Sequence, residues 1–151
     1  MTEAKMARFN FPLQNILNMK EKLEDQAKNE YSQANLRLRD AEEEMERLKK
    51  RQSDAEQELK VKLSEALDVR QIRQEEDGIE ILKSFVERQQ LVVLQRRREL
   101  EIARDKLNEA MKERKTFEKL REHAFEDFLK EQNLAEQKEI DELVSYRHGR
   151  V

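Results

Sequence analysis

The chain has 151 residues, enough for one or two small domains, but 43% of them are charged and only 36% hydrophobic, a poor composition for a globular core. The chain contains only two Gly and one Pro, and so low a content is typical of long helices and coiled coils. The net charge is only −3 with both signs mixed throughout, which disfavours a nucleic-acid-binding surface. The one basic cluster, Arg96 to Arg98, is followed at once by Glu99, and we interpret it as a solvated helix face.

Missing residue types and segments exclude further classes of site. The chain has no cysteine, so disulfides and thiolate metal sites are excluded. No apolar run approaches the roughly 18 residues that a membrane-spanning helix needs. Residues 1–8 lack the apolar core of a signal peptide. We therefore expect a soluble, cytoplasmic protein.

The first predicted helix covers about residues 11–65. Its start is marked by Asn10-Phe11-Pro12, because proline is tolerated in the first helical turn. Before Ala27 the apolar residues are Leu13, Ile16, Leu17 and Leu23, which indicates an irregular supercoil there. From Ala27 the steps alternate between four and three, the a/d pattern of a coiled coil. This seam contains Ala27, Tyr31, Ala34, Leu38, Ala41, Met45, Leu48, Gln52, Ala55 and Leu59.

A turn is predicted at about residues 66–68, and a second helix at about 69–147. Asp68 and Gln71 have the spacing of a capping box that opens this helix. His148-Gly149 is expected to end it. The second seam contains Ile79, Leu82, Val86, Gln89, Val93, Arg96, Leu100, Ala103, Leu107 and Ala110, and continues less regularly through Phe117, Leu120, Ala124 and Phe128.

The two seams predict an all-α fold, a single coiled-coil domain over residues 1–151 built as an antiparallel hairpin. Each helix has one apolar stripe that it cannot bury alone, and the nearest partner is the other helix. Pairing Gln52 with Gln89 places large side chains opposite small ones, but a slip of one heptad also packs acceptably. We expect the hairpin to be mostly monomeric.

A two-helix hairpin offers no enclosed pocket, so we expect no enzyme activity. No catalytic, cofactor-binding or metal site is predicted, and no small-molecule substrate. His123 and Asp127 have the i,i+4 spacing of a metal pair, but no third ligand is evident. We expect the chain to work by binding other proteins.

Two segments have residue patterns that a coiled coil alone does not require, and these patterns resemble the flagellar export protein FliJ family. Phe9-Asn10-Phe11-Pro12-Leu13-Gln14-Asn15-Ile16-Leu17 resembles that family's opening F-x-F-x-L-Q-x-I-L. The residues 118–122, Glu-Lys-Leu-Arg-Glu, and 136–142, Glu-Gln-Lys-Glu-Ile-Asp-Glu, resemble its closing E-K-L-R-E … E-Q-K-x-x-D-E. The resemblance covers nearly the whole chain, including the position of the break between the helices.

The resemblance implies a non-enzymatic stalk of the flagellar type III export ATPase complex. It implies that the paired chain ends sit in the pore of the hexameric ATPase ring and promote its assembly and activity. The other end of the hairpin would reach the cytoplasmic domain of the membrane export gate, and the family also handles export chaperones. The expected location is therefore the cytoplasm, peripherally at the inner face of the cell membrane at the flagellar base.

The predicted contact residues fall into two groups. For the ATPase ring they are Phe9, Phe11, Leu13, Gln137 and Asp141. For the export gate they are Leu82, Phe85 and Gln89, by position in the family; Gly78 departs from the bulky apolar residue expected there. Residues 79–94 are too apolar for one seam, and leftover apolar surface is typical of a partner site.

Several alternatives remain open from sequence. Phe9 and Phe11 can instead form an end cap of the hairpin. Leu82 and Phe85 can belong to the seam, with Ile79 and Val86 facing outward. For the whole chain, the alternatives are a generic structural coiled coil, such as a parallel homodimer, or the equivalent stalk of a virulence type III secretion system. A nucleic-acid-binding or membrane-surface helix is disfavoured by the mixed charge.

Overall fold

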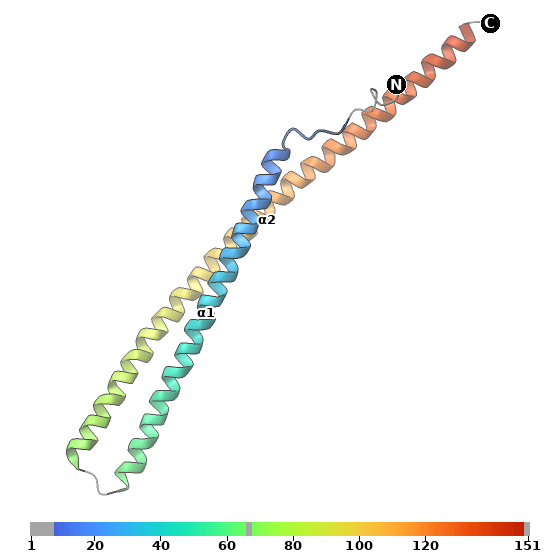
Figure 1. The fold of residues 1–151 in the computed structure, drawn as a ribbon. Helices are drawn as coiled ribbons and strands as arrows, with labels where there is room; N and C mark the ends of the chain where they lie inside the picture. The colour runs from blue at the N-terminus through green and yellow to red at the C-terminus, as the bar shows by residue number, and fades with distance from the viewer. Residues whose placement is uncertain (1–7, 66–67, 150–151) are drawn as a thin grey trace. The chain divides into compact units, whose positions relative to one another are not determined.

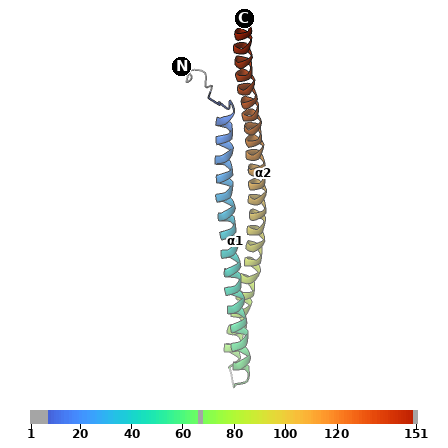
Figure 2. The ribbon, with the colours of Figure 1, turned by 90° about the vertical axis from the view of Figure 1, so that its right-hand side faces the viewer.

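The computed structural model describes residues 8–65 and 68–149. They form two long helices, α1 (Gln14–Leu63) and α2 (Val69–Gly149), and no strand occurs among these residues. The helices run side by side in opposite directions in both ribbon views (Figure 1 and Figure 2). The all-α helical hairpin predicted from the two seams is confirmed.

Helix α1 begins three residues later than the predicted start at residue 11. The backbone N–H of Gln14 donates to the carbonyl of Phe11 at 3.0 Å, so the Pro12-Leu13 pair forms a turn that leads into the helix. At its other end, the Ser64 and Glu65 N–H groups bond to carbonyls three residues back, which tightens the last turn. Residues 66 and 67 of the predicted turn lie outside the described residues.

Asp68 caps the start of α2, as its spacing predicts. Its side chain accepts a hydrogen bond from the Arg70 backbone N–H at 3.4 Å, and its carbonyl accepts from the Gln71 N–H at 3.1 Å. Such bonds satisfy N–H groups that have no partner within the helix. The helix then continues to Gly149, two residues beyond the predicted end.

The described residues group into two compact units. The tip unit contains residues 26–65 and 68–107, and the open-end unit contains residues 8–25 and 108–149. Each contains a length of α1 packed against a length of α2. Each is described separately below.

The predicted seam forms the core of the tip unit. Its central cluster consists of Ala41, Met45, Leu48, Val86 and Val93, with Leu38 and Val92 packed against it. Every predicted seam residue between Ala27 and Leu59, and between Ile79 and Leu107, is buried or half-buried. Ile79 and Val86 are buried whereas Phe85 is exposed, so the alternative seam with Leu82 and Phe85 inward and Ile79 outward is wrong.

The pairing of Gln52 with Gln89 is wrong. The Gln89 amide donates instead to the backbone carbonyl of Ala41 at 2.9 Å, eleven residues before Gln52 on α1. This contact fits the alternative register, slipped by one heptad, in which Gln89 lies at the level of Met45. The apolar pattern repeats every seven residues and is satisfied by both registers, so it cannot choose between them.

In the open-end unit the seam is more regular than the apolar residues indicated. Leu17 and Glu24 are buried and Lys20 is half-buried, which continues the a/d spacing toward the start of α1. Ile16 and Leu23, which were expected to contribute to packing, are exposed. The predicted shift of the pattern is therefore wrong, because polar residues occupy seam positions here and an apolar pattern does not register them. On α2, Phe117, Ala124 and Phe128 are half-buried as predicted, but Leu120 is exposed.

Candidate functional site

An aromatic clasp closes the open-end unit near the start of the chain. The Phe9 ring packs edge-on against Phe125, with centroids 5.1 Å apart, and against Phe128 at 5.6 Å. The Arg121 guanidinium lies 5.4 Å from the centre of the Phe9 ring, in cation–π range. Phe9, a predicted ring-contact residue, therefore packs within its own chain, as the end-cap alternative predicts. Phe125 was missed because it lies off the heptad positions; its only sequence signal is a second Phe three residues later.

The neighbouring predicted residues Phe11 and Leu13 lie inward as well. Phe11 is 7% exposed and Leu13 is half-buried. A side chain as buried as that of Phe11 offers a partner almost no contact area. Phe11 and Leu13 therefore contribute mainly to packing at the open end and present little surface to a partner.

A network of charged side chains crosses the open-end unit between the helices. Glu24, which is 5% exposed, pairs with Arg114, and Arg114 also bonds to Glu118 at 2.8 Å. The hydrogen bonds to Glu24 and Glu118 raise the pKa of Arg114, so it stays protonated. Lys20 adds a second pair with Glu113 at 2.9 Å. Sequence analysis missed this network, since nothing in the apolar pattern marks Glu24 as a core residue.

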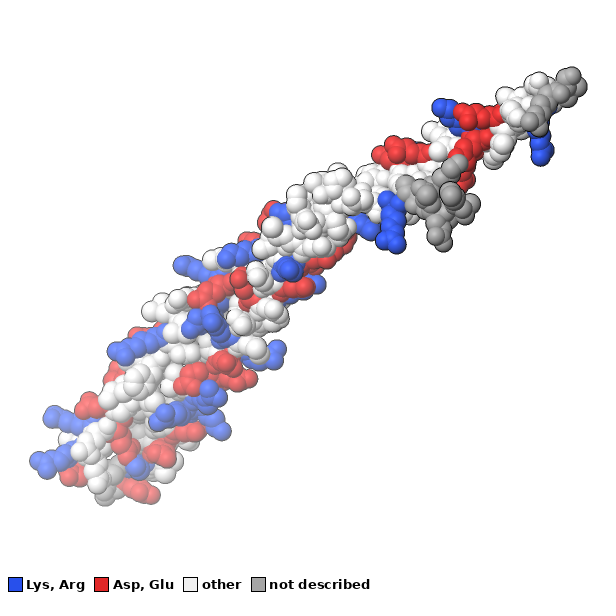
Figure 3. Space-filling model, turned by 45° about the horizontal axis from the view of Figure 1, so that its top comes forward, with Lys and Arg blue, Asp and Glu red and all other residues white. Residues whose placement is uncertain are grey.

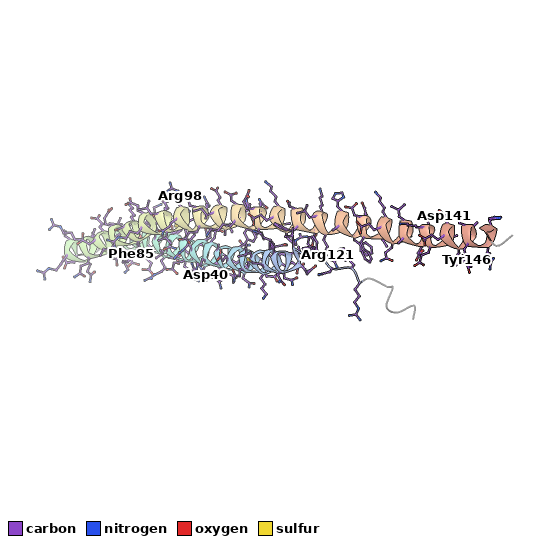
Figure 4. All side chains as sticks on the ribbon, turned by 90° about the horizontal axis from the view of Figure 1, so that it is seen from above. Asp40, Phe85, Arg98, Arg121, Asp141 and Tyr146 are labelled. Atoms are coloured by element: carbon purple, nitrogen blue, oxygen red, sulfur yellow. The ribbon has the colours of Figure 1, made fainter. Side chains whose placement is uncertain are left out.

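Two more interhelical contacts surround this network. The Arg121 Nε donates to the Gln14 Oε1 at 3.0 Å, so Arg121 contacts both the first residue of α1 and the Phe9 ring. Figure 4 labels Arg121 on α2. The Lys20 ammonium also lies 5.8 Å from the centre of the Phe117 ring. The open end is thus closed by aromatic and charged contacts together.

The last turns of α2 are different, because every residue from 133 to 149 is exposed. Gln137 and Asp141, the other predicted ring-contact residues, lie in this stretch, with 3.5 Å between their side-chain amide and carboxylate groups (Figure 4 labels Asp141). Gln137 is nine residues beyond Phe128, or about 14 Å along the helix axis. The structure therefore does not bring Gln137 and Asp141 into contact with the aromatic clasp.

In the tip unit, the predicted gate-contact residues face two directions. Phe85 is 43% exposed, whereas Leu82 is half-buried and the Gln89 amide points at α1. Phe85 and Leu82 share a groove of 360 Å³ with Gly78. The other lining residues are Arg51, Ala55, Glu58, Glu75, Ile79 and Ile81. Phe85 and Leu82 are accessible from one side of the hairpin, and Gln89 holds the helices together beside them.

The small residue at Gly78 explains part of this groove. A Cβ added at Gly78 would meet nothing within 4 Å, so space is open where a bulky apolar residue was expected. Nearby, Lys62 of α1 pairs with Glu75 of α2, and this hydrogen bond raises the pKa of Lys62. The ion pair ties the helices together on the turn side of the groove.

Other kinds of site were sought in the described part of the chain. No group of three His, Cys, Asp or Glu side chains there could hold a metal ion. His123 lies 3.8 Å from Glu126 on the same helix face. Neither α1 nor α2 contains a stretch apolar enough to cross a bilayer.

The family model described as "Flagellar FliJ protein" matches residues 9–151. The Flagellar FliJ protein of Bacillus subtilis (strain 168) is 28% identical over 135 residues, which cover 89% of this chain and 92% of that protein. Among solved structures, a YscO homolog from Chlamydia trachomatis has a similar fold, with a TM-score of 0.59, 23% identity, and coverage of 93% of this chain and 96% of that one. The family match extends from the aromatic clasp through the exposed last turns of α2. The chain therefore belongs to the flagellar FliJ protein family and is a component of flagellar type III export.

Proposed function

We propose that this protein is the non-enzymatic stalk of the flagellar export ATPase complex. Its open end binds the hexameric ATPase ring and promotes ring assembly and activity. Its tip unit binds the cytoplasmic domain of the export gate, and the chain takes part in handling export chaperones. It acts in the cytoplasm, held peripherally at the membrane beneath the flagellar base. Family membership and the helical hairpin support this proposal.

The exposed end of α2 is the observation that carries the ring contact. Its apolar side chains Leu134, Ile140, Leu143 and Tyr146 are between 54% and 69% exposed. At about 100° per residue, Tyr146, Leu143 and Ile140 lie about 120°, 180° and 240° around the helix axis from Leu134. Val144, which is 47% exposed, lies at about 280°, so four of the five large apolar side chains share one helix face and Leu134 lies opposite. This apolar face belongs to a stretch, residues 133–149, that is exposed throughout, and it supports contact with the ring.

The two groups of predicted ring-contact residues take different roles in this proposal. Gln137 and Asp141 belong to the fully exposed stretch and meet the ring directly. Phe9, Phe11 and Leu13 hold the start of α1 against α2, and so set where the protruding helix begins. A ring presents similar surfaces repeated around its axis, so one helix can touch several subunits.

Truncation tests the ring contact. Removal of residues 131–151 should abolish stimulation of the purified flagellar export ATPase, because the inserted segment is lost. Circular dichroism should still show a mostly helical protein, since residues 133–149 are exposed and the aromatic clasp and both seams lie before them. The matched control is Leu91→Ala, which changes an exposed apolar residue of the tip unit and should leave stimulation intact. Full stimulation by the truncated chain would contradict the proposal.

The alternative, the corresponding stalk of a virulence type III secretion system, is not favoured by any observation, because the YscO homolog at 23% identity indicates the fold alone. Binding tests the choice. The proposal requires the chain to bind a flagellar export ATPase more tightly than the ATPase of a virulence system, and the reverse order would contradict it.

A further inference from the structure

Gly78 is a glycine inside a helix, and the backbone there does not require one. It is the tenth residue of α2, and no glycine among the described residues has a positive φ, so the backbone could carry a side chain at this position. Glycine is disfavoured in helix interiors relative to alanine, because it loses the most conformational freedom on folding. The other glycine of the chain, Gly149, is the last residue of α2, close to where helices commonly end with glycine.

Packing within the chain does not require a glycine at this position either. A Cβ added at Gly78 would meet nothing within 4 Å. The position opens into the groove of 360 Å³ that Gly78 shares with Leu82 and Phe85. Glycine also serves where a group from outside must approach the backbone closely, and this role fits the open space at Gly78.

The gap at Gly78 belongs to an apolar face of α2. Ile81, Leu82 and Phe85 follow it at i+3, i+4 and i+7, and at about 100° per residue they lie within about 60° of it around the helix axis. Ile81 is 55% exposed and Phe85 is 43% exposed (Figure 4 labels Phe85). Of these four positions, Gly78 is the one without a side chain, at the end of the face nearer to the turn.

The charged side chains around the groove differ in their partners. Glu75 is paired with Lys62, and Glu75 and, to a smaller extent, Glu58 raise the pKa of that ammonium group. Arg51 of α1 also lines the groove, but it forms no hydrogen bond or ion pair with any residue that the structure describes. Figure 3 shows both signs interspersed over the visible face, so charge alone does not mark a site. Beside an apolar groove, such a guanidinium favours a partner with a carboxylate at that point.

We propose that a bulky apolar side chain of the export gate's cytoplasmic domain, next to an acidic residue, inserts over Gly78. This inference rests on the gate contact of the proposed function and adds the shape and the chemistry of the partner. The inserted side chain contacts Leu82 and Phe85 and completes the apolar face that Gly78 interrupts, while the acidic residue pairs with Arg51. Anchors that fill a pocket on the partner carry a large share of the binding energy of an interface.

The test uses the full-length chain and the purified cytoplasmic domain of the flagellar export gate. Gly78→Leu fills the space with a side chain of the protein itself, so binding should weaken at least tenfold, as expected for the loss of one well-packed anchor. The same change should raise the midpoint of thermal unfolding by about 2–4 °C, because leucine favours the helix far more than glycine does. Isothermal titration calorimetry and thermal unfolding measure the two effects.

Three further variants separate the causes. Gly78→Ala also stabilises the helix but leaves most of the groove open, and should bind within about threefold of the native chain. Gln90→Leu adds the same bulk about 120° around the helix from Gly78, at an exposed position outside this groove, and should bind as the native chain does. Arg51→Gln should weaken binding about threefold at low salt and less at high salt.

Each outcome bears on the inference. Native-like binding by Gly78→Leu overturns the insertion and leaves a gate contact through Phe85 standing. Equal weakening by Gly78→Ala or by Gln90→Leu overturns it as well, because helix rigidity or added bulk would then explain the loss. Native-like binding by Arg51→Gln overturns the acidic residue of the partner. If the native chain does not bind the gate domain, the gate contact of the proposed function fails and the inference with it.

Discussion

Gln89 and Phe85 show how closely spaced residues of one helix can serve different purposes. Phe85 is exposed on the side of the hairpin, whereas the Gln89 amide reaches across to the Ala41 carbonyl. The sequence analysis expected both, together with Leu82, to contact the export gate, and these positions i, i+3 and i+7 lie along one face of a helix. The long Gln side chain instead turns toward the other helix, where the backbone carbonyl of Ala41 accepts a hydrogen bond from its amide. Phe85 is therefore the residue on which the gate contact can be tested most directly.

We expect Phe85→Ala to separate binding from stability. Because the Phe85 side chain is 43% exposed, its removal should lower the free energy of unfolding by only about 1 kcal/mol, well below the ~3–5 kcal/mol of a Phe→Ala change in a core. Binding to the export gate's cytoplasmic domain should weaken by about 2 kcal/mol or more, the range of an aromatic hot spot. Thermal unfolding and isothermal titration calorimetry measure the two effects.

Val86→Ala provides the control for this experiment. Val86 is the next residue along α2 and is buried in the central cluster of the tip unit. Its truncation should lower stability by about 1–3 kcal/mol, because a cavity replaces packed methyl groups, while exposed Phe85 remains in place. A stable Phe85→Ala protein with normal gate affinity would show that the groove is not the gate site.

At the scale of the helices, the pair of buried Glu24 with Arg114 restricts how α1 pairs with α2. An apolar seam with a seven-residue repeat tolerates a slip of one heptad. A buried carboxylate does not, because the slip removes its guanidinium partner and leaves an uncompensated charge. Fixing the register is the best-attested role of buried charged groups in coiled coils.

A double-mutant cycle tests this coupling. Arg114→Leu alone should lower the midpoint of thermal unfolding by several degrees, since Glu24 then stays buried without its guanidinium. Glu24→Leu alone should cost less, because Arg114 keeps Glu118 and partial access to water. The double variant Glu24→Leu with Arg114→Leu should recover most of the loss, since two apolar residues pack in place of the ion pair.

The interaction free energy, which is the effect of the double variant minus the sum of the two single effects, decides whether the two residues are coupled. Effects of the two single changes that simply add in the double variant would mean that the pair is not coupled. Arg47→Leu is a suitable control, because Arg47 pairs with Glu44 on the surface of α1 alone and should have little effect on unfolding.

At the scale of the whole molecule, each helix already buries the apolar seam of the other. The large exposed apolar residues that remain are dispersed along both helices, for example Leu36, Leu91 and Leu134. Nothing in this arrangement requires a second copy of the chain to complete a core.

We therefore expect the purified protein to be a monomer. Light scattering coupled to size-exclusion chromatography should give a mass near 18.2 kDa across the peak. The mass should not rise with loading concentration, because the seam of each helix is already buried against the other and the exposed apolar residues are dispersed along both helices. A constant mass of twice this value would support the parallel-dimer alternative and contradict the hairpin in solution.

Much of the molecule follows from sequence alone, for a physical reason. Heptad spacing fixes which face of a helix is apolar, so the two helices, their seams in the tip unit and the hairpin could all be predicted. The absence of Gly and Pro between Pro12 and Gly78 is also a local signal, because either residue destabilises the helix in which it occurs. Phe9 and Phe11 could also be marked as residues of special role, since they stand outside any seam.

The tertiary structure decided what depends on the relation between the helices. The seven-residue repeat leaves the offset of α1 against α2 undetermined, and contacts between the helices, such as that of Gln89 with Ala41, distinguish the slipped register. Glu24 became a core residue because Arg114 of the other helix neutralises it. Phe125 joined the aromatic clasp because Phe9 of the opposite segment lies against it. Each of these outcomes needs a partner far away in the chain, and a pattern read along one helix contains no information about that partner.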